Sequence, residues 1–270
     1  MRRRGRGVPL VPVLLALVAV AFFVLPLVGL LRQVPWSSLW DDLQEPAARD
    51  AIRLSIECSL WSTFFSLLFG VPLAYVLART RFPGRALVRA LVILPMVLPP
   101  VVGGVALLYA FRRNDGLVGG LIYDLFDFQF TFSKWGVVLA ETFVAMPFLV
   151  ITAEAGFRSM DRRYEDAAAS LGAGRWTVFR RVTVPMVAPA LIAGAALAWA
   201  RALGEFGATI TFAGNIQGRT QTTPLAVYLL LEANPDVAVA LSLVLLAVSV
   251  VVLVSLRDHW FGGLRDGESA

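Results

Sequence analysis

The fold of this chain is constrained most strongly by six apolar stretches, each long enough to cross a lipid bilayer as a helix. They cover residues 8–31, 58–78, 86–111, 135–157, 186–212 and 237–256. Of all residues 58% are hydrophobic and only 16% are charged, and the mean hydropathy is +0.73. This composition is typical of a polytopic membrane protein rather than a soluble domain. We therefore predict an all-α membrane protein with six transmembrane helices.

The first apolar stretch follows an arginine cluster within residues 2–6. A cleaved signal peptide has the same layout, and Ala19-Val20-Ala21 mimics a cleavage site. However, the apolar run continues beyond this tripeptide to Leu31, which favours an uncleaved first helix.

The distribution of basic residues predicts the orientation in the membrane. With the N-terminus inside, cytoplasmic segments carry 16 basic residues and outer loops carry 7. The positive-inside rule therefore places both termini, and the segment 158–185, in the cytoplasm. Outer loops are expected at 32–53, 112–134 and 214–236, and Thr223-Pro224 in the last is typical of a short helix start. The net charge of +5 reflects these cytoplasmic arginines, so no nucleic-acid partner is expected.

The third apolar stretch contains the run Leu94-Pro-Met-Val-Leu-Pro99-Pro100. Proline removes a helical hydrogen bond and clashes with the preceding turn, so this span must bend or break. A broken backbone at membrane depth needs cover from protein or a water-filled path. Pro99 and Pro100 are thus candidates for lining a translocation pathway, although a purely structural kink accounts for them equally well.

The polar segment Asp161–Pro185 itself has a helical pattern. Asp161 can cap a helix whose residues Tyr164, Ala167, Ala168 and Leu171 share one face. Gly172 and Gly174 are expected to end this helix, and Pro185 is expected to limit a second one that begins near Trp176. An amphipathic segment lying on the membrane surface is the alternative interpretation.

The spacing within this segment resembles a cytoplasmic loop of permease subunits from ABC importers, which reads E-A-A, three residues, Gly, nine residues, Ile, one residue, Leu-Pro. The matching residues here are Asp166, Ala167, Ala168, Gly172, Val182, Val184 and Pro185, with Asp for Glu and Val for Ile and Leu. In that family the loop forms a coupling helix that docks on a separate ATPase subunit. The resemblance implies a type I ABC importer permease fold, with the coupling helix between helices 4 and 5. It also implies ATPase-coupling roles for Glu165, Asp166, Ala167, Ala168, Gly172 and Arg175.

A second resemblance covers residues 201–231, which contain G-E-F-G-A-T, A-G-N-I and T-x-T-x-P-L. This segment is similar to that of molybdate permeases, and the sulfate/thiosulfate permeases share its G-E-[FY]-G and T-x-x-T-P-L skeleton. The resemblance implies ATP-driven import of a tetrahedral oxyanion, with molybdate ahead of tungstate or sulfate. It implies three partners in a bacterial inner membrane: a second copy of the chain, an ATPase subunit, and an extracytoplasmic oxyanion-binding protein. No cofactor is expected in this chain, since ATP and Mg²⁺ would bind the ATPase.

The same resemblance implies a domain organisation with a permease core at 51–256. An N-terminal tail, first helix and outer loop precede it at 1–50, and a cytoplasmic tail follows at 257–270.

The fifth stretch carries charged residues and a stripe of small residues. Ala190, Gly194, Ala198 and Ala202 recur every four residues, which permits close helix packing. Arg201, Glu205 and Thr209 follow at the same spacing and are candidates for the pathway, because intramembrane charges usually face a bundle interior or water. Alternatively, Arg201 and Glu205 neutralise each other and hold the helix in place.

The sequence argues against a catalytic role for the chain. Lys134 is its single lysine and no phosphate-binding G-x-x-x-x-G-K precedes it. One cysteine, Cys58, and one histidine, His259, cannot build a metal site. An integral-membrane enzyme or an ATP-independent transporter remains as an alternative, but neither needs an ATPase-docking helix.

Overall fold

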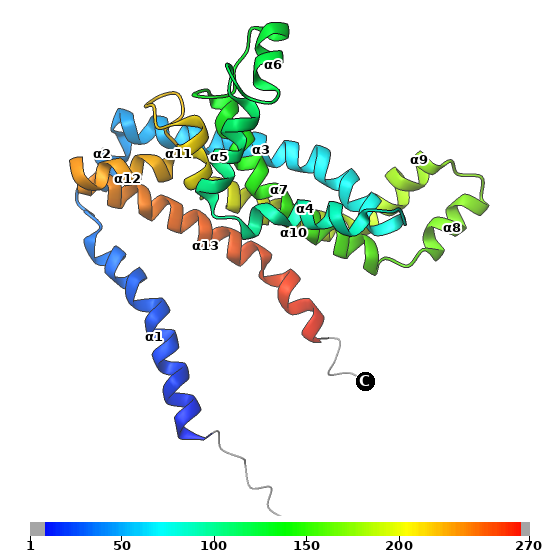
Figure 1. Cartoon of the computed structure of the whole chain (residues 1–270). Coiled ribbons are helices and arrows are strands. Elements are labelled where there is room, and N and C mark those ends of the chain that lie inside the picture. Colours follow the sequence, from blue (N-terminus) through cyan, green and yellow to red (C-terminus); the bar gives the residue numbers. More distant parts are fainter. Residues whose placement is uncertain (1–8, 266–270) are drawn as a thin grey trace, which may run out of the picture.

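The structure, a computed structural model, describes residues 9–265, of which 256–265 are described by their backbone alone. Every regular element in this range is helical, as predicted (Figure 1). The arginine cluster at 2–6 and the side chain of His259 lie outside the described part. The α-helices are α1 Leu10–Gln33, α2 Leu39–Gln44, α3 Pro46–Arg79, α4 Arg85–Val97, α5 Pro100–Phe111, α6 Gly119–Phe126, α7 Lys134–Ser159, α8 Arg163–Ser170, α9 Arg175–Val178, α10 Val184–Leu203, α11 Gly207–Ala213, α12 Thr223–Ala233 and α13 Pro235–Arg265, and one π-helical turn, η1, spans Phe179–Thr183.

Five of the spans predicted from the sequence are long apolar helices. They are α1, α3, α7, the continuous helix Arg175–Leu203, and α13. The helices α4 and α5 provide the sixth span if the pair is counted as one, and the chain bends by 119° between them. The predicted break at Pro99-Pro100 is therefore confirmed: α4 ends at Val97, and Pro100 opens α5.

Helix α7 forms the middle of the bundle and packs against both α3 and α10 (Figure 1). Small residues allow these helices to approach closely. A Cβ atom placed on Gly156 of α7 would lie 2.5 Å from the Ala190 Cβ of α10. On α3 a stripe of small residues is buried, formed by Ser55, Ser59, Ser62, Ser66, Gly70 and Ala74.

Three sequence-based predictions about element boundaries were wrong. The second span begins at Pro46, because the expected loop 32–53 folds into α2 and the first turns of α3, so Cys58 lies inside α3 rather than at its start. The fifth span ends at Leu203, since the backbone leaves the helix at Gly204 and restarts as α11. Pro185 does not end the second helix of the polar segment.

The π-helical turn explains why Pro185 is tolerated. Proline lacks the N–H that an α-helix needs and crowds the preceding turn. Here η1 directly precedes α10, and Pro185 lies in the first turn of α10. The wider π turn carries the chain past this residue, and Arg175–Leu203 runs as one helix of 29 residues.

Short helices lie at the two ends of the bundle. The helices α2, α11 and α12 lie at one end, α6 stands apart above α5, and α8 and α9 project from the other end (Figure 1). Helix α12 begins at Thr223 with Pro224 in its first turn, as the sequence predicts. Helix α1 leaves the bundle beside α13 and buries none of its residues (Figure 1).

Candidate functional site

The segment 161–185 forms the predicted helix–glycine–helix unit. The N-cap position of α8 is Arg162 rather than the predicted Asp161, which lies one residue earlier. The backbone N–H of Arg163 nevertheless donates to Asp161 Oδ1 at 3.0 Å. Gly172 adopts φ +84°, a left-handed conformation that favours glycine, and the N–H of Ala173 reaches back to the Ala168 carbonyl at 3.1 Å. This turn reverses the chain between α8 and α9.

The acidic residue Glu165 fixes α8 to the bundle. Its Oε1 accepts a hydrogen bond of 2.8 Å from the Thr183 hydroxyl in η1 and lies 3.6 Å from Arg79 Nη2 at the end of α3. Arg162 adds a second link, because its Nη2 donates to the Arg79 carbonyl at 3.1 Å. The side chain of Asp166, by contrast, is exposed. Glu165 is therefore the acid that holds the segment in position.

The outer surface of the segment is apolar and exposed. The side chains of Tyr164, Leu171 and Trp176 project from it, and Leu171 keeps 90% of its surface. Ala167 is exposed and Ala168 is half-buried, so the predicted alanine face lies beside these side chains. Arg175 is exposed at the first position of α9. Large exposed apolar side chains at the tip of a projecting unit are typical of a binding surface.

A row of aromatic side chains leads from this surface into the bundle. The Trp176 ring stacks on Phe179 with centroids 5.7 Å apart, and Phe179 meets Tyr75 of α3 edge-on at 5.0 Å. Tyr75 in turn contacts the fully buried Phe157 of α7 at 5.4 Å. Because packed rings resist displacement, a movement of α9 would be passed to α3 and α7. The sequence analysis did not identify Tyr75 or Phe157.

The charged pair of the fifth span lies at the junction of α10 and α11. Arg201 Nη2 is 2.5 Å from Glu205 Oε2, while Glu205 Oε1 accepts a hydrogen bond of 2.8 Å from the Ala208 N–H. Glu205 is 1% exposed and Arg201 is 27% exposed. Both carboxylate oxygens thus have partners, and Glu205 joins the end of α10 to the first turn of α11. This geometry fits the interpretation in which the pair holds the helix in place.

The remaining candidate pathway residues lie close to this junction. Pro99 and Pro100 are exposed at the bend between α4 and α5. A Cβ on Gly207 would lie 2.8 Å from the Pro100 Cβ, so the bend packs on the start of α11. Thr209 is completely buried, and its hydroxyl has no hydrogen-bond partner among the described residues. The structure therefore brings the proline bend and the G-E-F-G-A-T segment together.

Two glutamates inside α7 were noted in the sequence only as charges within a span. Glu141 is 1% exposed, and its Oε2 has no hydrogen-bond partner among the described residues. Glu154 instead faces three arginines, pairing with Arg89 of α4 and with Arg158 at 2.9 Å, and lying 3.9 Å from Arg85. It thus ties the start of α4 to α7.

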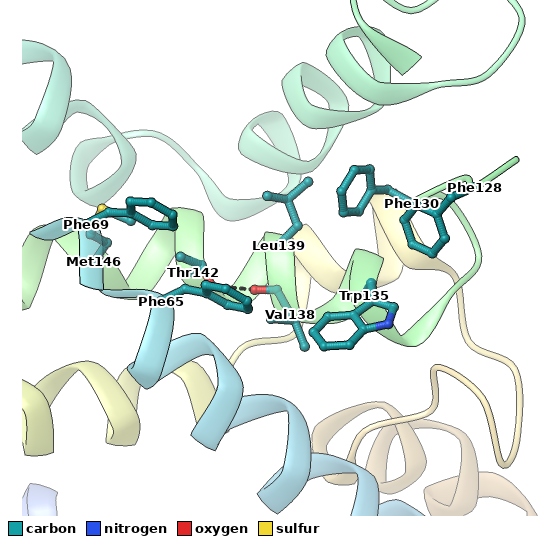
Figure 2. Close-up of a pocket in the computed structure, with 9 residues that line it drawn as sticks. All are labelled: Phe65, Phe69, Phe128, Phe130, Trp135, Val138, Leu139, Thr142 and Met146. Carbon is teal, nitrogen blue, oxygen red and sulfur yellow. Dashed lines mark hydrogen bonds between the residues drawn. The ribbon is translucent and has the colours of Figure 1, made fainter. Parts of the chain in front are cut away.

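One cavity in the described part of the chain is apolar. It has a volume of about 510 Å³ and is bounded by aromatic and aliphatic side chains from α3, α7 and the loop before α7 (Figure 2). Figure 2 shows Phe65, Phe69 and Trp135 on its wall, with Thr142 turned toward the Val138 carbonyl, to which its hydroxyl donates at 2.6 Å. No charged group lines this cavity. It is therefore unsuited to holding an oxyanion.

Comparison with known proteins places these features in a family. Residues 70–261 match the family described as binding-protein-dependent transport system inner membrane component. The molybdenum transport system permease protein ModB of Mycobacterium tuberculosis is 50% identical over 157 residues, which are 58% of this chain and 59% of that protein. ModB of Escherichia coli is 41% identical over 161 residues, covering 60% of this chain and 70% of that protein. The sulfate transport system permease protein CysT of Escherichia coli is 39% identical over 157 residues, 58% of this chain and 56% of that protein.

Solved structures agree on the fold. A bacterial alginate ABC transporter in complex with an alginate-bound periplasmic protein contains a chain with TM-score 0.72 and 19% identity, covering 92% of this chain and 93% of that one. The MetNI methionine ABC transporter contains a chain with TM-score 0.54 and 17% identity, covering 77% of this chain and 93% of that one. At these identities the comparison concerns the fold alone.

Proposed function

Because the chain belongs to the family of binding-protein-dependent transport system inner membrane components, we propose that it is the permease subunit of an ATP-driven importer of molybdate. In this proposal two copies form one pathway across the bacterial inner membrane, with both termini in the cytoplasm. Separate subunits hydrolyse ATP with Mg²⁺, and an extracytoplasmic protein delivers the oxyanion. The permease chain itself needs no cofactor.

The observation that supports an ATPase partner is the exposed surface of the projecting α8–α9 unit. It exposes Leu171 and Trp176, which gain most from burial against another protein. It is also held by Glu165 and connected by aromatic contacts to α3 and α7. An ATPase bound to this surface could move α3 and α7 through these contacts. ATP binding would draw the two α8–α9 units together and open the pathway outward, and hydrolysis would reset it.

Active transport is consistent with the charge of the proposed substrate. Bringing a dianion into a cell against an inside-negative potential of 100 mV costs about 4.6 kcal/mol. A passive pore would therefore let the anion leave, whereas coupling to ATP hydrolysis offsets this cost.

Molybdate is favoured over sulfate by the degree of similarity. The two molybdenum permeases compared above are 50% and 41% identical to this chain, and the sulfate permease is 39% identical. The matched region spans only 59% of the Mycobacterium relative, so molybdate as the substrate of this chain is a proposal. Sulfate, thiosulfate or tungstate is the second candidate.

Transport in reconstituted vesicles tests the proposal. The full-length chain is co-expressed and co-purified with a candidate ATPase subunit and an oxyanion-binding protein from the same organism, and uptake of labelled molybdate is measured with and without ATP. We expect ATP-dependent uptake that excess tungstate suppresses more strongly than excess sulfate. Stronger suppression by sulfate would identify sulfate, rather than molybdate, as the substrate. Failure of any ATPase to co-purify would refute the permease assignment.

A further inference from the structure

A second, polar cavity lies where α3 ends and α4 begins, close to α8. Its volume is about 310 Å³. The lining residues are Ala78, Arg79, Thr80, Arg81, Arg85 and Arg162. Four of the six are arginines and none is acidic, so the cavity wall carries a strong positive charge.

Two of the arginines that line this cavity carry a guanidinium N–H group without a hydrogen-bond partner within residues 9–265. Arg79 is 8% exposed, and its Nη2 donates to the Met160 carbonyl at 3.3 Å, but its buried Nε has no partner among the described residues. The Nε of Arg85 is likewise buried and without a partner. Buried polar groups are normally hydrogen-bonded, so two orphaned guanidinium N–H groups beside one cavity indicate an acceptor that binds there.

The nearby carboxylates do not balance this charge. Glu165 lies 3.6 Å from Arg79 but is also engaged by Thr183. Glu154 lies 3.9 Å from Arg85 and is shared with Arg89 and Arg158. No ion pair joins Arg81 or Arg162 to an acid in the described part of the chain. The cluster therefore keeps an excess of positive charge at the membrane edge.

We propose that this cavity, the arginine pocket, binds a phosphate-type tetrahedral oxyanion through Arg79, Arg81, Arg85 and Arg162. Guanidinium groups match such an anion with several parallel N–H donors, and charge-assisted bonds of this kind are the strong ones. The site is distinct from the proposed pathway, since Arg201 and Glu205 lie at the far end of α10. It extends the proposed function but does not depend on it.

Two sources could supply the same group. One is free phosphate from solution. The other is the headgroup of an anionic phospholipid, because basic pockets between membrane helices bind such headgroups. Leu87 and Leu91 are exposed on α4 just beyond Arg85 and would lie along the acyl chains of a lipid.

Either ligand would act on the α8–α9 unit. Arg79 contacts Glu165, and Arg162 holds the Arg79 carbonyl, so the pocket shares two residues with the attachment of α8. A bound anion would neutralise the excess charge around this attachment and stiffen it.

Binding is tested with the purified full-length chain and two probes. Labelled inorganic phosphate is titrated by equilibrium dialysis in a neutral detergent. For the second probe, the chain is reconstituted in nanodiscs of phosphatidylglycerol and phosphatidylcholine and then released from them. Native mass spectrometry measures how much phosphatidylglycerol stays bound to the chain. Arg81→Gln is the main variant, because Arg81 is exposed and has no ion pair among the described residues, and Arg85→Gln is the second. Arg180→Gln is the matched control, since Arg180 is an exposed arginine of η1 that does not line the pocket.

We expect one probe to bind wild type and the control equally, and to bind Arg81→Gln about tenfold more weakly. Saturable phosphate binding in detergent identifies the free anion, whereas phosphatidylglycerol retention without phosphate binding identifies the lipid. The proposal is overturned if neither probe binds wild type, or if Arg180→Gln weakens binding as much as Arg81→Gln and Arg85→Gln do.

Discussion

The Thr183 hydroxyl donates a 2.8 Å hydrogen bond to Glu165 Oε1 across 18 residues of chain, and so fixes α8 against η1. Arg79 faces the same carboxylate oxygen from the end of α3. One acid thus connects three elements that lie far apart in sequence. Its loss should weaken the attachment of α8 to both η1 and α3.

We predict that Glu165→Ala lowers the stability of the purified chain by about 1–3 kcal/mol, because a charged hydrogen bond and an ion pair are lost. Glu165→Gln should cost less, since the amide oxygen can still accept from Thr183. The single cysteine, Cys58, is fully buried, so its reaction with a thiol-reactive dye on heating reports unfolding. Combining Glu165→Ala with Thr183→Val should cost less than the sum of the two changes. Strictly additive effects, or an equal loss from Asp166→Ala, would show that Glu165 does not hold the segment.

Substitution of Gly172 should act through the backbone. Its φ of +84° is unfavourable for other residues, but no atom lies within 4 Å of an added Cβ. Gly172→Ala is therefore expected to cost about 1–2 kcal/mol of strain without a clash. Gly172→Arg should in addition obstruct docking, and so abolish uptake while the protein remains in the membrane. The matched control is Gly174→Ala, where φ is −65° and the space is equally open. Normal assembly and uptake in Gly172→Arg would refute the coupling role.

Substitutions of Arg201 and Glu205 distinguish a structural role of this pair from a role in the translocation pathway. Arg201→Gln leaves the buried Glu205 with the Ala208 N–H alone, and we expect a loss of about 3 kcal/mol. Glu205→Gln should cost less, because Arg201 is partly exposed and can reach water. The double variant should recover part of the loss, since no buried charge remains. Unfolding is followed with the Cys58 dye alongside molybdate uptake, and Arg219→Gln in an exposed loop serves as the control. If Arg201→Gln abolishes uptake in a protein of normal stability, Arg201 belongs to the pathway.

Close packing of α7 and α10 predicts a sharp response at Gly156. A Cβ at this position would meet Ala190 at 2.5 Å and Val187 at 2.8 Å, so Gly156→Ala should destabilise the chain by about 1–3 kcal/mol. Gly29→Ala in α1 is the control, because nothing lies within 4 Å of its added Cβ. Equal melting of the two variants would mean that α7 and α10 are farther apart than the structure places them.

The proposed orientation is tested with reporter fusions at Gly218 and Asp266. Gly218 lies in the loop before α12, at the opposite end of the bundle from α8 (Figure 1). We expect the Asp266 fusion to be active in the cytoplasm and the Gly218 fusion outside. If both fusions report the same side of the membrane, the proposed cytoplasmic location of the α8–α9 unit is wrong.

The sequence by itself determined the features that depend on local chemistry. Apolar stretches of sufficient length must become helices in a bilayer, because the backbone has no other hydrogen-bond partners there. Pro99 and Pro100 must interrupt the third span, and the pattern around Gly172 must form a helix, a turn and a second helix. Each of these outcomes needs only the properties of neighbouring residues, so the pattern was sufficient.

The tertiary structure decided which distant groups meet. No periodicity places Arg79 beside Glu165, brings Arg85 and Arg89 to Glu154, or packs Phe179 against Tyr75 and Tyr75 against Phe157. Likewise, the fifth span ends at Leu203 because Glu205 is buried between Arg201 and the start of α11, although the apolar sequence continues to Phe212. These contacts depend on how α3, α4, α7 and α10 pack, and packing is a property of several segments at once rather than of any one of them.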